Sequence, residues 1–227
     1  VEGIDGAVRE AEAGRRPEVR LGRPALAERT LLRWMFGRVM TADTLATMVD
    51  VLSYLRRPDE ISGYVSAELD RIAAERDGRR VVAIGLSLGG IILVDTLTKR
   101  AAAAAAASAT AATEPPAVPV DLLVTVGSQS PFLLACDALG ELRRGGPRPL
   151  RPFVPWLNVW NPDDYLSYPA GPIFGDAVRP RAALRDVLGR DGSAFPAVHG
   201  RYWDDDTTFA AIADMLGDVA GGRFARH

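Results

Sequence analysis

Residues Val81-Val82-Ala83-Ile84-Gly85-Leu86-Ser87-Leu88-Gly89-Gly90-Ile91-Ile92-Leu93-Val94 place one serine between two apolar runs. The first run is β-branched and typical of a buried strand, whereas the second opens on glycines and is typical of a helix. Gly85 and Gly89, two residues before and two after Ser87, would let the backbone turn sharply and lift the hydroxyl clear of the chain. This arrangement predicts a nucleophilic serine, and the alternative is a tight glycine-rich turn with a spectator serine.

Further strands and helices alternate along the chain. Residues 120–126 and 156–160 are apolar runs that predict buried strands. Apolar spacing of three to four residues, or a favourable start, predicts helices over 58–77, 88–100, 132–142 and 207–216. Strands separated by helices predict an α/β fold with a mostly parallel sheet flanked by helices, in which ligands bind beyond the carboxyl ends of the strands.

The length of 227 residues fits one domain, 1–227, whose hydrophobic core is large enough to be stable without disulfides or bound metals. Residues 31–56 have helical spacing with a break at 41–43, and we expect them to form a helical cap that could line an acyl pocket. Residues 101–119 form a low-complexity linker whose alanines favour an extension of the preceding helix, the mobile part beginning at about residue 109.

Composition limits the classes of partner. A net charge of −2, with 48% hydrophobic and 25% charged residues, is ordinary for a soluble protein and gives no electrostatic case for nucleic acid. We expect no integral membrane segment, because no apolar run approaches about 20 residues. The start at Val1 lacks a signal-peptide layout, which favours a cytoplasmic location. The single cysteine, Cys136, is expected to be a buried thiol.

A serine nucleophile needs a base that titrates near neutral pH, and this points to histidine. Of the two histidines, His227 is the last residue, so we assign the base to His199, in a loop before the final helix. The carboxylate that orients the imidazole is expected from Asp163 or Asp164, which follow the 156–160 strand. We favour Asp164, which precedes an apolar pair, and interpret the other as a turn residue after Pro162.

The chain resembles the α/β-hydrolase superfamily in three segments, which carry Ser, Asp and His in that order. They are strand-Gly-Leu-Ser-Leu-Gly-Gly-helix, strand-Asn-Pro-Asp-Asp and loop-His-Gly-Arg-Tyr-Trp-helix. Three stretches also look similar to bacterial lipase-like hydrolases related to the GPI-inositol-deacylase and serine-esterase branch: Ser-Leu-Gly-Gly, Val-Gly-Ser-Gln-Ser-Pro and Val-His-Gly-Arg-Tyr-Trp. The resemblance covers roughly residues 45–216. It implies that the backbone N–H of Leu88 is one oxyanion donor and that no cofactor or metal is required.

The same resemblance implies a second oxyanion donor on a loop after an earlier strand, and no such strand precedes Ser87. Two explanations compete. The chain lacks its first strands because it is a fragment, which the start at Val1 favours, or a reduced sheet uses a different donor.

Three other features have two interpretations each. Residues 127–130 either place a polar group beside the site or cap the helix that Pro131 initiates, which we favour. Residues 204–206 are three aspartates that we assign to a helix start and not to a metal. The four tryptophans either pack in the core, our default, or line an acyl pocket.

These patterns predict a cofactor-independent serine hydrolase that cleaves a small-molecule carboxylic ester, of lipid or acyl type, through an acyl-enzyme. Ser87, His199 and Asp164 would form the triad. The alternatives are a catalytically inactive relative that serves as an interaction or scaffold domain, and the hydrolase part of a larger effector. The pattern does not separate esterase, lipase, thioesterase and amidase.

Overall fold

The computed structural model describes residues 42–110, 119–135, 154–174 and 183–224. The chain divides into two compact units, 1–50 and 51–227. Helix α3 (Ala42–Arg56) crosses the boundary between them, and its described side chains beyond residue 50 belong to the second unit. Residues 31–41 of the expected cap, Cys136 and His227 lie outside the described residues, so the predictions made for them stay predictions.

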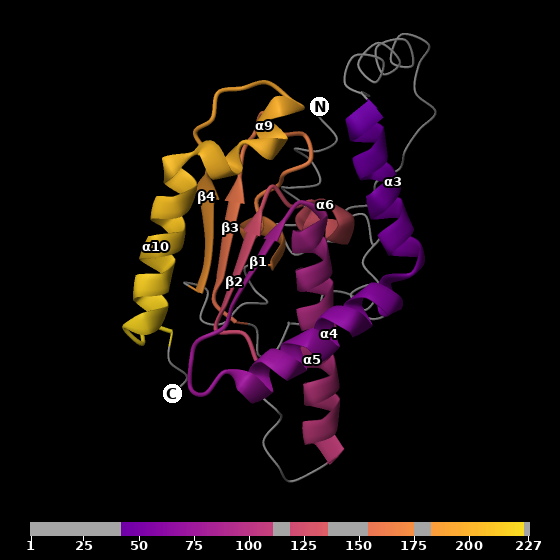
Figure 1. The fold of residues 1–227 in the computed structure, drawn as a ribbon, viewed down its shortest axis with the longest axis vertical. Coiled ribbons are helices and arrows are strands. Elements are labelled where there is room, and N and C mark those ends of the chain that lie inside the picture. The colour runs from indigo at the N-terminus through magenta and orange to yellow at the C-terminus, as the bar shows by residue number, and fades with distance from the viewer. Residues whose placement is uncertain (1–41, 111–118, 136–153, 175–182, 225–227) are drawn as a thin grey trace. The chain divides into compact units, whose positions relative to one another are not determined.

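The second unit is built on four parallel strands in the order β1 (Val82–Leu86), β2 (Leu122–Val126), β3 (Trp156–Trp160) and β4 (Leu184–Leu188) (Figure 1). Neighbouring strands are in close register, with Val82 opposite Leu122 and Trp156 opposite Leu184. The α/β class, the parallel arrangement and the first three strands are confirmed. The fourth strand was not predicted.

Helices cover both faces of this sheet. Helices α4 (Pro58–Glu75) and α5 (Leu88–Thr110) lie on one face and α10 (Asp206–Ala220) on the other (Figure 1). Shorter elements connect the strands: α6 (Ser130–Ala135), α8 (Gly171–Phe174), α9 (Ala197–Gly200) and the 3-10 turn η2 (Tyr202–Asp204). The sequence prediction of a loop around His199 is therefore corrected to a single helical turn, α9.

The alanine tract is part of α5. The helix continues through Thr110, and Ala101 and Ala104 are buried against the rest of the unit. The expected extension of the helix through the alanines of the low-complexity stretch 101–119 is therefore confirmed as far as residue 110. Residues 111–118 lie outside the described residues.

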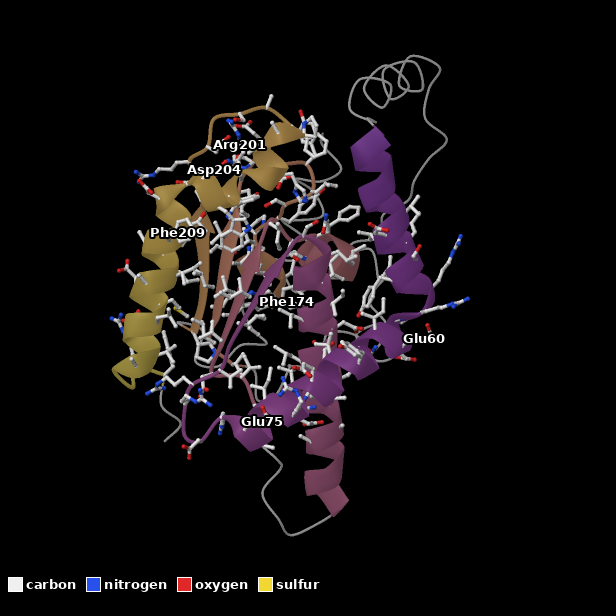
Figure 2. All side chains as sticks on the ribbon, viewed as in Figure 1. Glu60, Glu75, Phe174, Arg201, Asp204 and Phe209 are labelled. Carbon is white, nitrogen blue, oxygen red and sulfur yellow. The ribbon has the colours of Figure 1, made fainter. Side chains whose placement is uncertain are left out.

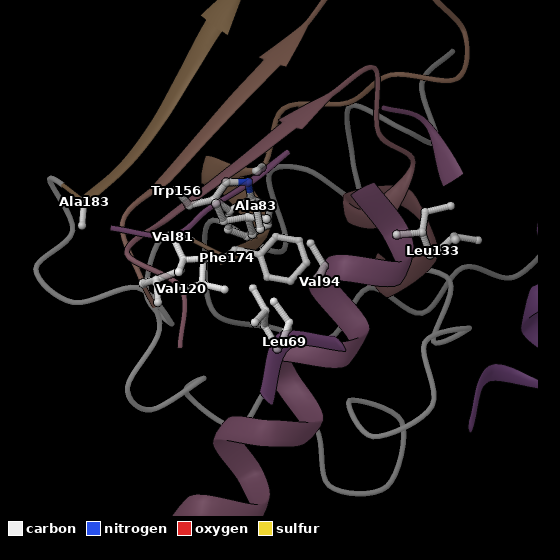
Figure 3. Packing of buried hydrophobic residues seen from close by; sticks show 14 of the residues in the cluster. Leu69, Val81, Ala83, Val94, Val120, Leu133, Trp156, Phe174 and Ala183 are labelled. Carbon is white, nitrogen blue, oxygen red and sulfur yellow. The ribbon is translucent and has the colours of Figure 1, made fainter. Parts of the chain in front are cut away.

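Two hydrophobic clusters hold the layers together. On the α4 and α5 face, Leu69, Val94 and Phe174 meet in one cluster, with the ring of Phe174 4.9 Å from that of Trp156 (Figure 3). On the opposite face, Met215 of α10 packs against Val124 and other strand residues. Trp156 is fully buried, as the default expectation of core packing has it, whereas Trp203 is 36% exposed and departs from that expectation.

Ion pairs hold α4 where it crosses α5 (Figure 1). Lys99 lies 2.8 Å from Asp59, and Arg100 lies 2.6 Å from Asp70. Figure 2 shows Glu60 and Glu75 near the two ends of α4, whereas Phe174 lies in the interior. These ion pairs join the middle of α5 to α4, about three helical turns after Ser87.

No helix in the described part of the chain is long and apolar enough to cross a membrane.

Candidate active site

The segments that follow the strands converge at one edge of the sheet. Ser87 comes directly after β1, and its N–H donates to Val126 O at 2.8 Å, which extends the ladder by one residue. Gly127 after β2 donates in the same way to Val159 O at 2.9 Å. Asp164 lies four residues after β3, and His199 is carried by α9 beyond β4. The predicted site residues therefore share the edge at which parallel sheets bind ligands.

Ser87 is held in a strained backbone conformation. Its φ of +51° lies in the left-handed region, which costs a non-glycine residue of order 1 kcal/mol or more. Gly85 permits the turn, because a Cβ there would lie 2.5 Å from the backbone carbon of Gly89. Gly89 itself has open space around its Cα, so the prediction that a small residue is required there is corrected. The restricted position is Gly90, where a Cβ would lie 2.7 Å from Ser128 Oγ.

Ser87, His199 and Asp164 form a continuous hydrogen-bonded chain. Ser87 Oγ lies 2.9 Å from His199 Nε2, and His199 Nδ1 lies 2.8 Å from Asp164 Oδ2. Because an ionised carboxylate only accepts, Nδ1 carries the imidazole proton, and the lone pair of Nε2 is left to face the serine hydroxyl. The His199 side chain is 16% exposed, so solvent reaches the chain at the serine end and not at the aspartate.

The carboxylate of Asp164 is 1% exposed and fully supplied with donors. Besides His199, Oδ2 accepts from the Tyr202 hydroxyl at 2.8 Å, and Oδ1 accepts from the Leu166 N–H at 3.0 Å. Asp163 is exposed, and its N–H donates to Asn161 Oδ1 in the turn, so the preference for Asp164 over Asp163 agrees with the geometry. Both oxygens of this buried carboxylate therefore have a hydrogen-bond donor.

Tyr202 was not predicted from the sequence. Burial, followed by the charge of Asp164, raises the pKa of its phenol well above the ordinary value, so the hydroxyl remains a donor across the working pH range. The only signal for it was its position three residues after His199, which brings its ring to the same carboxylate once η2 forms.

Gly127 lets these groups pack closely. It has a φ of +58°, and a Cβ at this position would lie 2.8 Å from Tyr202 Cε2 and 3.4 Å from Asp164 Oδ2. The backbone after β2 thus passes directly under the acid and the tyrosine, and any side chain there would push them away from His199.

Residues 127–130 fulfil both interpretations of this stretch. Ser128 is fully buried and its Oγ accepts the Ser130 N–H at 3.2 Å at the start of α6, which is a capping role. Gln129 places its Nε2 3.4 Å from Ser87 Oγ, so a polar group also lies beside the serine. Its backbone carbonyl accepts from Leu133 at 2.9 Å and fixes the residue at the helix start.

Leu88 is the first residue of α5, so its backbone N–H has no acceptor within the helix. The N-terminus of this long helix also carries a partial positive charge, which favours an anion beside Ser87. In the described residues no strand precedes β1, and β1 has β2 as its single neighbour. A second backbone donor on an earlier strand is therefore not found among the described residues.

The three aspartates at 204–206 begin α10. Asp205 is its N-cap, accepting from Thr207 N–H at 2.9 Å and from Arg190 N–H after β4. Partial burial opposes its charge, but these two donors outweigh burial and lower the pKa of Asp205. Figure 2 shows Asp204 next to Arg201 on the segment before α10. Within the described residues, no group of three His, Cys, Asp or Glu side chains is placed to hold a metal ion.

Two aromatic pairs lie on the segments that carry the site residues. Phe132 of α6 stacks on Tyr168 with ring centroids 5.3 Å apart, and Tyr165 meets Phe195 at 5.3 Å. Phe132 and Tyr165 remain 46% and 61% exposed. We name these four residues the aromatic rim.

Comparison with models of known protein families, with curated proteins and with solved structures found no match to this chain.

Proposed function

We propose that the protein is a serine hydrolase of the α/β-hydrolase type that cleaves carboxylic esters through an acyl-enzyme. The observation that carries this proposal is the chain of hydrogen bonds from Ser87 Oγ through His199 to the buried Asp164, with distances of 2.9 and 2.8 Å. A strained serine aimed at a histidine that a carboxylate orients is the arrangement that activates a hydroxyl for acyl transfer.

In the proposed reaction His199 Nε2 takes the proton of Ser87 as Oγ bonds to the ester carbonyl carbon. The carbonyl π pair moves onto oxygen, and the resulting tetrahedral intermediate collapses by expelling the alkoxide, which takes the proton from His199. Water, deprotonated by His199, then attacks the acyl-enzyme, and Ser87 leaves with that proton. Asp164 stabilises the imidazolium at both stages and keeps its charge.

The oxyanion of each tetrahedral intermediate would be stabilised by the N–H of Leu88 and the positive end of α5. Both are preorganised, because Leu88, Ile91 and Val94 at the start of α5 pack in the hydrophobic cluster against the sheet before substrate arrives. Removing one such donor in other enzymes costs about 10²–10³ in kcat.

The aromatic rim supports an apolar acyl or alkyl group on the substrate. Exposed aromatic side chains commonly mark a binding surface, and each of the two aromatic pairs has one strongly exposed ring. Phe132 follows Gln129 by three residues and Tyr165 follows Asp164 by one, so both exposed rings lie on segments that also carry site residues. We expect an apolar group of the substrate to contact these rings. Oligomeric state plays no part in this proposal.

The direct test is turnover of p-nitrophenyl esters with acyl chains of increasing length, with early time points recorded for a burst of nitrophenol. We expect hydrolysis with a burst equivalent to about one acyl group per chain, because acylation precedes a separate deacylation step. Ser87→Ala and His199→Ala should lose several orders of magnitude in kcat. Thr96→Val, far along α5, is the matched folded control and should retain full activity.

An inactive interaction domain is the second candidate, favoured by the position of β1 at the edge of the described sheet, without an earlier strand to supply a backbone donor. A folded wild-type chain that neither hydrolyses any ester of the series nor shows a burst would support this candidate and contradict the hydrolase.

A further inference from the structure

Gln129 is a buried amide that points at the nucleophile and lacks part of its hydrogen bonding. The side chain is 5% exposed, and its Nε2 lies 3.4 Å from Ser87 Oγ. Its Oε1 is buried with no hydrogen-bond partner among the described residues. A buried amide that leaves one end unpaired loses roughly 1–3 kcal/mol, so its position beside the serine calls for a physical reason.

One end of the Gln129 amide lacks a hydrogen-bond partner in either orientation of the amide. If oxygen and nitrogen were exchanged, the oxygen would face Ser87 and the two N–H donors would take the unpartnered place. In the orientation of the structure Nε2 donates to Ser87 Oγ, which leaves the hydroxyl proton free to point at His199. The second orientation would draw that proton away from His199 and is disfavoured by the chain of hydrogen bonds already present.

The backbone of Gln129 is fixed and its side chain is buried, which limits the conformations open to the amide. Its carbonyl accepts from Leu133, and its neighbours Ser128 and Ser130 are fully buried with their hydroxyls 2.8 Å apart. A side chain held in this way reaches the reacting atoms without reorganisation, which is the property required of a group that stabilises charge in a transition state.

We propose that the side-chain amide of Gln129 is an oxyanion donor that acts with Leu88 N–H, in place of a backbone donor from an earlier strand. This inference rests on the proposed hydrolase function. When Ser87 Oγ bonds to the carbonyl carbon, the π pair moves to an oxygen that lies roughly 2.3 Å from Oγ by standard tetrahedral geometry. Nε2, at 3.4 Å from Oγ, is too far for a strong bond to the serine and near enough to donate to that oxygen. No proton is transferred to or from the amide.

The test compares wild type with Gln129→Met and Gln129→Glu in steady-state hydrolysis of the best p-nitrophenyl ester. Methionine keeps the length without donors, and glutamate keeps the shape while replacing the donors by acceptors, so a folding defect in one variant would not be shared by the other for the same reason. Thr96→Val is the matched control, because it also removes a buried polar atom without a partner among the described residues, about 13 Å from Ser87 along α5. Melting temperatures establish folding, and binding of an alkyl boronic acid reports on the tetrahedral adduct.

We expect both Gln129 variants to lose about 100-fold in kcat with KM changed less than about threefold, since an oxyanion donor acts only on the transition state. Their affinity for the boronic acid should fall by a similar factor, whereas Thr96→Val should match wild type in every measurement. An active wild type with kcat within threefold in both variants would overturn the inference and leave the hydrolase standing, as would a raised KM with unchanged kcat. An inactive wild type that also fails to bind the boronic acid would contradict the hydrolase itself, and the inference with it.

Discussion

Replacing Tyr202 by phenylalanine removes the hydroxyl that donates to the buried carboxylate of Asp164, together with the hydrogen bond between this hydroxyl and Ser167. Asp164 accepts from His199, Leu166 and Tyr202, so the variant leaves a buried charge with two of three donors. Hydrogen bonds to charged groups contribute about 1.5–3 kcal/mol each, which predicts a loss of about 2 kcal/mol in the free energy of unfolding. For a chain of this size that corresponds to a fall in Tm of about 4–8 °C.

Part of this loss should enter the catalytic barrier. With the Tyr202 hydroxyl gone, Oδ2 is held by His199 alone and the carboxylate is less firmly aligned with the imidazole. Loss of about 1.4 kcal/mol of this hydrogen bond's free energy from the stabilisation of the transition state would lower kcat about tenfold. Asp164→Asn should fall much further, since it removes the charge that stabilises the imidazolium.

Tyr54→Phe is the matched control. Its hydroxyl donates to the buried Asp95 at 2.6 Å, on the α3 and α5 side and away from the candidate site, and burial raises the pKa of this phenol as it does for Tyr202. Thermal unfolding and ester hydrolysis measured on both variants separate stability from catalysis. We expect similar losses of Tm and a loss of kcat in Tyr202→Phe alone. Equal kcat in both variants would refute the reasoning that Tyr202 supports catalysis through Asp164.

Three further predictions concern the elbow, a helix cap and the aromatic rim. Gly85→Ala should destabilise the fold by several kcal/mol and abolish activity, because its Cβ meets the backbone of the first turn of α5. Gly89→Ala should unfold at the same temperature as wild type or higher. The same melting temperature for the two variants would contradict this prediction. Asp205→Asn should lower the free energy of unfolding by about 1 kcal/mol above pH 4 and leave it unchanged at lower pH, because the lowered pKa of Asp205 stabilises the fold only while the carboxylate is charged. Asp204→Asn serves as control. Unfolding curves that differ from wild type at low pH and coincide with it at neutral pH would contradict this prediction. Tyr165→Ser should lower kcat/KM for long acyl esters more than for acetate, since it removes apolar contact area; a uniform fall across the chain-length series would argue against an acyl-binding rim.

The first three strands could be predicted because the residue types within each strand and those that follow it indicate the same structure. The strands around Ile84, Val124 and Val159 are short runs of β-branched or apolar residues, and each is followed by a turn or polar stretch. Strand β4 has no such signal. Arg185 and Asp186 interrupt it, and the strand is stabilised by partners distant in sequence.

Asp186 shows why β4 was missed. Its carboxylate accepts from Asn158 on β3 at 2.7 Å and from the N–H groups of Ala170 and Gly171 at the start of α8. A charged residue in a half-buried strand is stable only with such partners, and their positions 15 to 28 residues away are not readable from local pattern.

The candidate site likewise contains residues that could be predicted from the sequence and residues that could not. Ser87, His199 and Asp164 could be predicted because few residue types serve each role and their order along the chain is informative. Tyr202 and Gln129 could not be assigned, since a tyrosine and a glutamine have many uses. Their roles depend on how η2 and the start of α6 fold onto the carboxyl ends of β1 and β3. Gly89 was misjudged because the close contact is made by Gly90 with a serine 38 residues away.

The most direct test of the central claim is the intact mass of the folded chain after incubation with a fluorophosphonate, measured for wild type, Ser87→Ala, His199→Ala and Ser66→Ala. Ser66 lies on α4, where its hydroxyl accepts from Arg100 at 2.6 Å, and it serves as the matched serine control. We predict one adduct on wild type and on Ser66→Ala, none on Ser87→Ala, and labelling that is slower by orders of magnitude on His199→Ala. An adduct that persists in Ser87→Ala, or a folded wild type that remains unlabelled, would contradict an activated Ser87.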